Sequence, residues 1–169
     1  MITALTIISA LLIVTYTAAV CIKADGVPYS ISETYYKIEH KFFFGVTMVL
    51  TACLLMPAIL EVTPESYQFT AFLACAGMIA TGVAPNFREG FEKRVHTAGA
   101  VICLLFSQVW VMLTCPWMLL VWVGYLAYTA IGLWRNWNGY FIGSFLSTKP
   151  MFWVEITALA ATYVTLLIN

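Results

Sequence analysis

Six long apolar segments dominate this sequence of 169 residues, and the short stretches between them hold nearly all of its charges. Only 9% of the residues are Asp, Glu, Lys or Arg, and 62% are hydrophobic. An average soluble domain has about 25% charged and about 45–50% apolar residues. So few charges cannot cover the surface of a water-soluble protein. We therefore expect an all-α integral membrane protein, a bundle of six transmembrane helices forming one membrane domain over residues 1–169.

The length of each apolar segment is close to what a membrane-spanning helix requires. About 20 helical residues cross the roughly 30 Å hydrocarbon core of a bilayer. The segments are continuous runs, whereas strands of a membrane barrel alternate apolar and polar residues. The third and fifth segments are short and must borrow flanking residues to cross. The expected spans are residues 2–22, 42–60, 69–84, 95–113, 117–133 and 151–168.

The positions of the basic residues predict the orientation of these spans. All eight Lys and Arg residues fall in or beside the first, third and fifth connections of the six-span arrangement. Cytoplasmic loops of membrane proteins carry an excess of Lys and Arg. The sequence therefore predicts cytoplasmic loops at residues 23–41, 85–95 and 134–150. Both termini are then external, and the membrane is expected to be the cytoplasmic membrane of a cell.

Charge balance and missing motifs narrow the function. Basic and acidic residues number 8 each, so no positive field exists to hold nucleic acid. The lipid bilayer is the expected partner, with a small solute or lipid as a further candidate, and the sequence gives no indication of oligomeric state. No GxSxG, HExxH, phosphate-loop or GxGxxG pattern occurs. Ser30 and Ser32 are interpreted as helix-capping residues and not as nucleophiles.

A helix-start signal lies in the first connection. Ser30 and Glu33 have the spacing of a capping box, in which each side chain satisfies an amide of the first helical turn. Glu33 and Lys37 are spaced for an ion pair one turn apart. We therefore expect the second helix to begin near Ile31, before the hydrocarbon region starts.

Three ionisable residues stand near the cytoplasmic ends of the second, fourth and sixth spans: His40, His96 and Glu155. An ionisable side chain inside a span is energetically expensive and is a functional-site candidate by default. Each helix continues with small or hydroxyl residues on the same face, which is typical of close packing between helices. We expect the three side chains to face one polar cavity on the cytoplasmic side.

Two chemistries fit such a cluster, and a structural role is the alternative. Two imidazoles and a carboxylate, from Glu33, Glu39, Glu92 or Glu155, are suitable ligands for a divalent metal. The same groups suit proton transfer, because histidine titrates near neutral pH. No spacing motif supports a metal, since the ligands come from separate helices. In the structural alternative the histidines cap or pair at the interface, and Glu155 pairs with Lys149 or His96.

Other polar residues have simpler expected roles. Asn86, Arg88 and Lys149 lie at the predicted cytoplasmic surface and are candidates for contact with a lipid headgroup. Gln108 lies in the middle of a span, where an interhelical hydrogen bond is its expected role.

Three functions remain open at this stage. In the first, the bundle binds or conducts a small solute, ion or lipid through the polar cavity. In the second, it is an intramembrane or interfacial enzyme that acts on a lipid with a His/carboxylate or metal site. In the third, it is an assembly partner or pore-forming module. A polar path across the membrane would favour the first, a closed half-depth cavity the second, and a dry interior the third.

Overall fold

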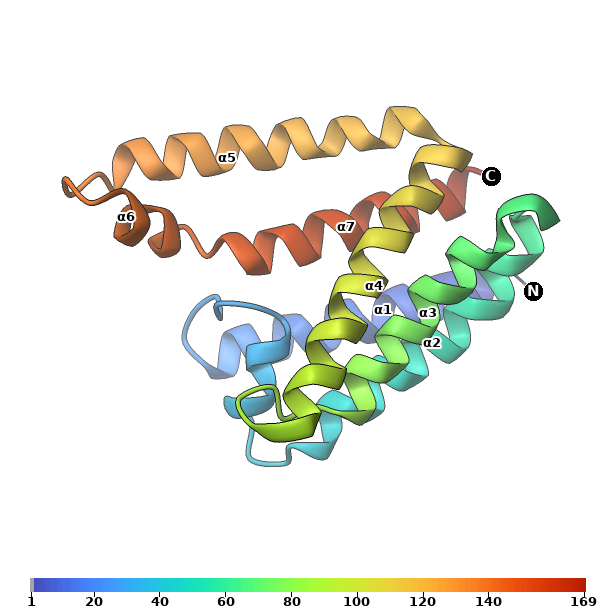
Figure 1. Cartoon of the computed structure of the whole chain (residues 1–169), viewed down its shortest axis with the longest axis horizontal. Coiled ribbons are helices and arrows are strands. Elements are labelled where there is room, and N and C mark those ends of the chain that lie inside the picture. Colours follow the sequence, from blue (N-terminus) through green and yellow to red (C-terminus); the bar gives the residue numbers. More distant parts are fainter. Residues whose placement is uncertain (1) are drawn as a thin grey trace.

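The computed structural model describes residues 2–169, and this part of the chain is entirely helical and irregular structure (Figure 1). Three short 3-10 helices, η1 (Ser32–Tyr36), η2 (Glu65–Tyr67) and η3 (Pro116–Leu120), lie in the connections. The all-α prediction is confirmed. The seven α-helices of the described residues are α1 (Ile2–Lys23), α2 (Phe42–Val62), α3 (Gln68–Val83), α4 (Gly90–Thr114), α5 (Val121–Arg135), α6 (Phe141–Ser147) and α7 (Pro150–Ile168).

Six helical stretches are long and apolar enough to cross a membrane. Four are the single helices α1, α2, α4 and α7, while η2 with α3 and η3 with α5 form the other two. These last two confirm that the third and fifth spans borrow flanking residues. The helix α6, with 7 residues, is too short to span and lies between α5 and α7. The chain is a polytopic helical membrane protein.

Helices that are neighbours in sequence pack side by side from α1 to α4 (Figure 1). The helix α7 packs against both α4 and α1, and α5 packs against α7. None of the side chains of α5 is buried within the protein. The bundle therefore has a well-packed body, α1 to α4 with α7, and a peripheral span, α5.

The closest helix contact joins α3 to α4 through two glycines. A Cβ atom on Gly77 would lie 2.5 Å from the Cys103 amide nitrogen and 2.6 Å from the Gly99 carbonyl oxygen. A Cβ atom on Gly99 would lie 2.8 Å from the Gly77 carbonyl oxygen. Small residues let membrane helices approach until their backbones touch, which maximises van der Waals contact. The two glycines therefore set the distance between α3 and α4.

Buried polar contacts connect helices that are far apart in sequence. The Ser9 hydroxyl of α1 donates to the Thr51 carbonyl of α2 at 2.9 Å. It lies 2.6 Å from the Tyr163 hydroxyl of α7, which is then the donor because the Ser9 hydrogen is already used. The first and last spans are thus joined inside the bundle.

The predicted interhelical role of Gln108 is confirmed. Its amide nitrogen donates to the Ala158 carbonyl of α7 at 3.2 Å. Its amide oxygen accepts from the Trp122 indole of α5 at 2.9 Å. One side chain of α4 therefore contacts both α5 and α7, and it ties the peripheral span to the body.

Trp110 of α4 holds the C-terminal end of α2. Its side chain is fully buried, and its indole N–H donates to the Thr63 hydroxyl at 2.7 Å. The Thr63 hydroxyl in turn donates to the Ile59 carbonyl, one turn earlier in the chain. Thr63, the C-cap residue of α2, is thereby held against α4.

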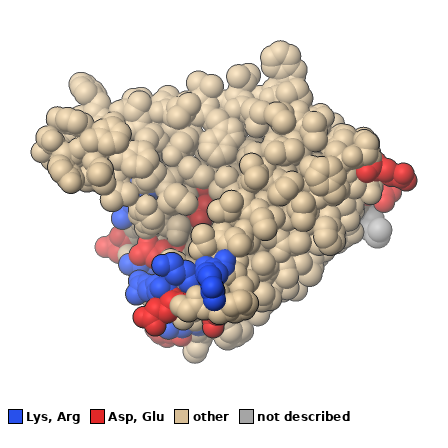
Figure 2. Space-filling view, viewed as in Figure 1, with Lys and Arg blue, Asp and Glu red and all other residues tan. Residues whose placement is uncertain are grey.

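All eight Lys and Arg residues lie at one end of the bundle, in or beside the connections α1–α2, α3–α4 and α5–α7. We call this the basic end. Figure 2 shows the blue side chains gathered at that end of the visible face, while most of the remaining surface carries no charge. Both termini lie at the opposite end (Figure 1), as an even number of spans requires.

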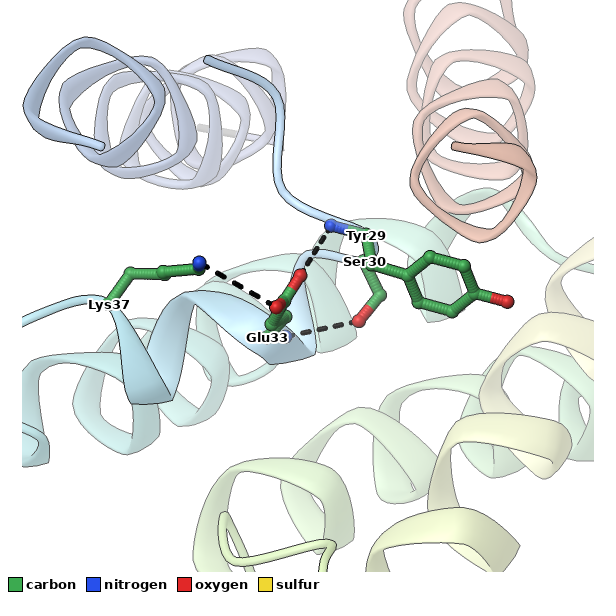
Figure 3. Close-up of polar contacts among 4 residues, drawn as sticks. All are labelled: Tyr29, Ser30, Glu33 and Lys37. Atoms are coloured by element: carbon green, nitrogen blue, oxygen red, sulfur yellow. Dashed lines mark hydrogen bonds and ion pairs between the residues drawn. The ribbon is translucent and has the colours of Figure 1, made fainter. Parts of the chain in front are cut away.

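One of the two contacts of the predicted capping box forms in the first connection, but it does not start α2. The Glu33 amide donates to the Ser30 hydroxyl at 3.0 Å, and the Glu33 carboxylate accepts from the Tyr29 amide at 2.5 Å (Figure 3). Lys37 lies 3.8 Å from the same carboxylate. These contacts lie at the start of the five-residue η1, and α2 begins at Phe42. The prediction of an α-helix from near Ile31 is therefore wrong.

Tertiary contacts explain why η1 stays short. The Thr34 side chain is fully buried, and its hydroxyl donates to the Ile31 carbonyl and accepts from the Tyr16 hydroxyl of α1. The Ile31 amide donates to the Glu155 carboxylate of α7. The segment is held between α1 and α7, so the chain must turn at residues 38–41 before it enters α2.

Candidate functional site

A cavity of about 490 Å³ lies inside the bundle between α7 and the helices α1 to α4. Its wall is almost entirely apolar and includes residues such as Ile13, Met48, Cys75 and Leu104. The prediction of a polar cavity is therefore wrong for most of its surface. The polar residues that line it are Ser32, Thr81, Ser107, Glu155 and Thr162.

Three of these five polar residues offer the cavity little hydrogen-bonding capacity. The hydroxyls of Thr81, Ser107 and Thr162 donate to carbonyls of their own helices, three or four residues earlier. Only Ser32 and Glu155, which lie near the basic end, present polar groups with other partners. The cavity is thus an apolar chamber with one polar corner.

The cavity opens sideways between α4 and α7. Val101 and Leu105 of α4 and Met151 of α7 line it and are also 59%, 54% and 42% exposed, respectively. This exposure favours a place for these residues at the edge of the cavity. Because α4 and α7 are both candidate membrane spans, an opening between them would face the hydrocarbon of a bilayer.

Glu155 contributes a carboxylate that lacks a charged partner. Its Oε2 atom accepts from the Ile31 amide at 2.5 Å. Among residues 2–169, no Lys, Arg or His nitrogen lies within 4.0 Å of the carboxylate. The expected alternative pairing with Lys149 or His96 does not form. The other carboxylate oxygen makes no hydrogen bond within the described chain and is available at the polar corner.

His96 is the buried histidine of the pair. Its side chain is 4% exposed. The ring is stacked on Phe44 and tilted against Phe87, with ring centroids at 6.2 and 5.0 Å, respectively. Its Nδ1 lies 2.9 Å from the Ala84 carbonyl oxygen, and its Nε2 lies 2.9 Å from the Ser32 hydroxyl. A carbonyl can only accept, so Nδ1 carries the hydrogen in the neutral ring. Nε2 then accepts the hydrogen bond from Ser32.

The start of η1 connects these groups. The Ile31 amide contacts Glu155, and the next residue, Ser32, contacts His96. The structure thus brings two of the three predicted residues to the same corner, where they are bridged by this segment and not in direct contact. Sequence reasoning missed Ser32 as a member of the site, because its partner lies 64 positions away and no local motif marks it.

His40 is not part of this corner. It lies exposed in the turn before α2, with its ring edge against Phe43. Glu39 is exposed and pairs with Lys23 at 3.2 Å, and exposed Glu92 accepts from the Asn86 amide. The predicted convergence of the three ionisable residues is therefore incomplete.

The geometry does not support the metal site that the sequence left open. Within the described part of the chain, no three His, Cys, Asp or Glu side chains are grouped closely enough to hold a metal ion.

No family model, curated protein or solved structure matches the chain. The chemistry of the cavity and its polar corner is therefore the basis for assigning a function.

Two of the three residues expected to contact headgroups lie together at the basic end. The Arg88 guanidinium stacks over the Tyr36 ring at 4.0 Å from its centroid. The Tyr36 hydroxyl donates to the Asn86 side chain at 2.8 Å. Lys149 lies on a different connection, directly before α7, in the left-handed conformation with φ 55°. Arg88 remains exposed, so its charge is accessible at the basic end.

Proposed function

We propose that this protein binds one amphipathic, lipid-like molecule that enters its cavity from the bilayer. The observation that carries the proposal is an apolar cavity with an opening between two membrane spans and a single carboxylate inside. Its volume of about 490 Å³ falls within the range of about 300–1,000 Å³ that is usual for small-molecule sites. Such a volume accommodates an alkyl chain of moderate length.

The polar group of the ligand decides which molecule binds. Lipid tails are as apolar as the cavity wall, so moving an alkyl chain from bilayer to cavity provides little hydrophobic free energy. Selectivity must come from the polar corner. The free oxygen of Glu155 accepts hydrogen bonds, and an isolated carboxylate in apolar surroundings is costly. A head that donates hydrogen bonds, such as an ammonium or a hydroxyl group, satisfies this carboxylate.

The same features favour binding over ion conduction. A conducting path must replace the hydration shell of an ion with carbonyl or charged groups along its length. The lining of this cavity offers such groups only at the corner formed by Ser32 and Glu155. An ion would therefore face an apolar barrier through the rest of the chamber.

Blocking the opening tests this function. We expect Leu105→Trp to reduce binding of a photo-crosslinkable long-chain amine to the detergent-purified protein at least tenfold, because the indole fills the edge of the cavity. Leu113→Trp is the matched control, since Leu113 is exposed on the same helix but does not line the cavity. Glu155→Gln should weaken the amine at least tenfold and a matched long-chain alcohol less, with little change in thermal unfolding. Equal crosslinking in all variants, or none in the wild-type protein, would contradict the proposal.

We further place the basic end in the cytoplasm and the chain in the cytoplasmic membrane, since Lys and Arg accumulate on the cytoplasmic side. Reporter domains fused after Pro64 and after Asn169 are expected to be external, and one inserted after Arg88 should be cytoplasmic. Protease added to intact cells should cleave an external reporter and leave a cytoplasmic one intact, which determines the side of each position. An internal reporter at either of the first two positions would overturn this orientation.

A further inference from the structure

Ser32, His96 and Ala84 form a chain of hydrogen bonds that ends at the cavity. The Ser32 hydroxyl lies 2.9 Å from His96 Nε2, and His96 Nδ1 lies 2.9 Å from the Ala84 carbonyl. A hydroxyl in contact with an imidazole whose other nitrogen is oriented by a third group is the arrangement that activates serine nucleophiles. Ser32 itself is one of the residues that line the cavity.

The position of the imidazole is fixed on every side. The carbonyl of Ala84 sets its tautomer, and the rings of Phe44 and Phe87 flank it. Because the ring is buried, its Nε2 atom can reach little except the Ser32 hydroxyl. A rigid base of this kind holds the nucleophile in one geometry, which reactive sites require.

Ser30 provides an internal comparison. Its hydroxyl accepts from the Glu33 amide within the capping contacts and does not line the cavity. Two serines, two positions apart in one connection, thus have different environments. Only Ser32 combines a base with access to the cavity.

We propose that Ser32 is a nucleophile, with His96 as its general base, for cleavage of an acyl ester held in the cavity. This inference rests on the proposed function, since the cavity must supply the amphipathic ester. Ser32 Oγ bonds to the ester carbonyl carbon while its proton passes to His96 Nε2. The bond from that carbon to the alcohol oxygen then breaks, and the alcohol leaves with the proton from His96.

Water completes the reaction. A water molecule attacks the acyl group on Ser32, and His96 Nε2 accepts a proton from it. The bond to Ser32 Oγ breaks, Ser32 regains the proton from His96, and the fatty acid is released. The sum is ester plus water to acid plus alcohol, so no oxidant, reductant or metal is required.

Two measurements on the full-length wild-type protein in detergent test the proposal without any variant. We expect a small fluorophosphonate to label Ser32, as located by mass spectrometry of its peptide. We also expect turnover of the 4-nitrophenyl ester of a ten-carbon acid. If neither labelling of Ser32 nor ester turnover is found, the proposal is wrong.

Variants then test the role of each residue. Ser32→Ala should abolish labelling, and Ser30→Ala should leave it unchanged. His96→Gln keeps a hydrogen-bonding side chain beside Ser32 but removes the base, so the labelling rate should fall about 10²–10⁴-fold, the usual contribution of general base catalysis. Labelling of His96→Gln at the wild-type rate, in protein with wild-type thermal unfolding, would overturn the role of His96.

The two proposals fail in different ways. Leu105→Trp should suppress turnover of the long-chain ester while the small fluorophosphonate still labels Ser32. Labelling without binding of the long-chain amine would remove the proposed function and keep the reactive serine. Amine binding without labelling or turnover would remove the reactive serine and keep the binding function.

Discussion

Gly77→Ala is expected to destabilise the folded bundle by about 3 kcal/mol, at the upper end of the usual range for overpacking. The added Cβ would lie within 2.6 Å of two backbone atoms of α4, and no rotamer change can move a backbone away. The helices α3 and α4 must therefore separate, and they lose contact along their most extensive interface. Reversible unfolding in mixed micelles measures the difference.

Gly124→Ala is the matched control for this substitution. Gly124 also lies within a membrane span, but no atom approaches within 4 Å of its added Cβ. We expect a change of less than about 1 kcal/mol, with alanine favoured by its higher helix propensity. If Gly77→Ala were as stable as Gly124→Ala, the backbone contact between α3 and α4 would not exist as described.

Trp110→Ala is expected to cost about 3–5 kcal/mol, the range for deleting a large buried aromatic side chain. Trp110 is 0% exposed and joins α4 to the end of α2 through Thr63. Trp110→Phe keeps most of the volume and should cost about 1 kcal/mol, the net value of one hydrogen bond. Micellar unfolding again provides the measurement.

An exposed tryptophan provides a control for the loss of an indole, and a double variant measures the hydrogen bond of Trp110. Trp117→Ala removes an indole that is 75% exposed and should change stability by less than about 0.5 kcal/mol. Thr63→Val combined with Trp110→Phe should cost less than the sum of the single changes, because both remove the same bond. Strict additivity would show that the bond contributes nothing.

The spans and the one-sided placement of basic residues were predictable because each depends on local composition. A run of about 20 apolar residues is helical in a bilayer whatever surrounds it. Gln108 was predictable for a related reason, since an amide in mid-span must find a partner on another helix. The particular partners, Trp122 and Ala158, depend on packing and were not predictable.

In the first connection, local sequence signals do not determine how far the helix extends. Ser30 and Glu33 do make capping contacts, yet contacts of Ile31 and Thr34 with other helices decide how far the helix extends. His40 and His96 both lie near the basic ends of their spans in the sequence, but only His96 is buried in the bundle. Tertiary packing decides which of the two histidines is buried, and it cannot be inferred from the sequence around them.

The polarity of the cavity was mispredicted for a specific physical reason. Hydroxyl residues on inward faces suggested a polar chamber. In the structure, Thr81, Ser107 and Thr162 donate to carbonyls of their own helices, so their methyl or methylene groups are the remaining contact surface. In a membrane helix, a threonine with this internal bond behaves largely as an apolar residue.

The bond between Ser9 and Tyr163 spans 154 positions of the chain and has a consequence for biosynthesis. A membrane protein enters the bilayer from its N-terminus as it is translated, so α1 to α4 are in place before α7 has been made. Until residues 150–168 leave the ribosome, the cavity lacks its α7 wall and is a groove that faces lipid. The contacts of Ser9 with Tyr163 and of Ile31 with Glu155 then do not yet exist, while the Ser9 hydroxyl can already donate to the Thr51 carbonyl of α2. The hydrogen bonds that join the last span to the rest of the bundle therefore form only after residues 150–168 have been made.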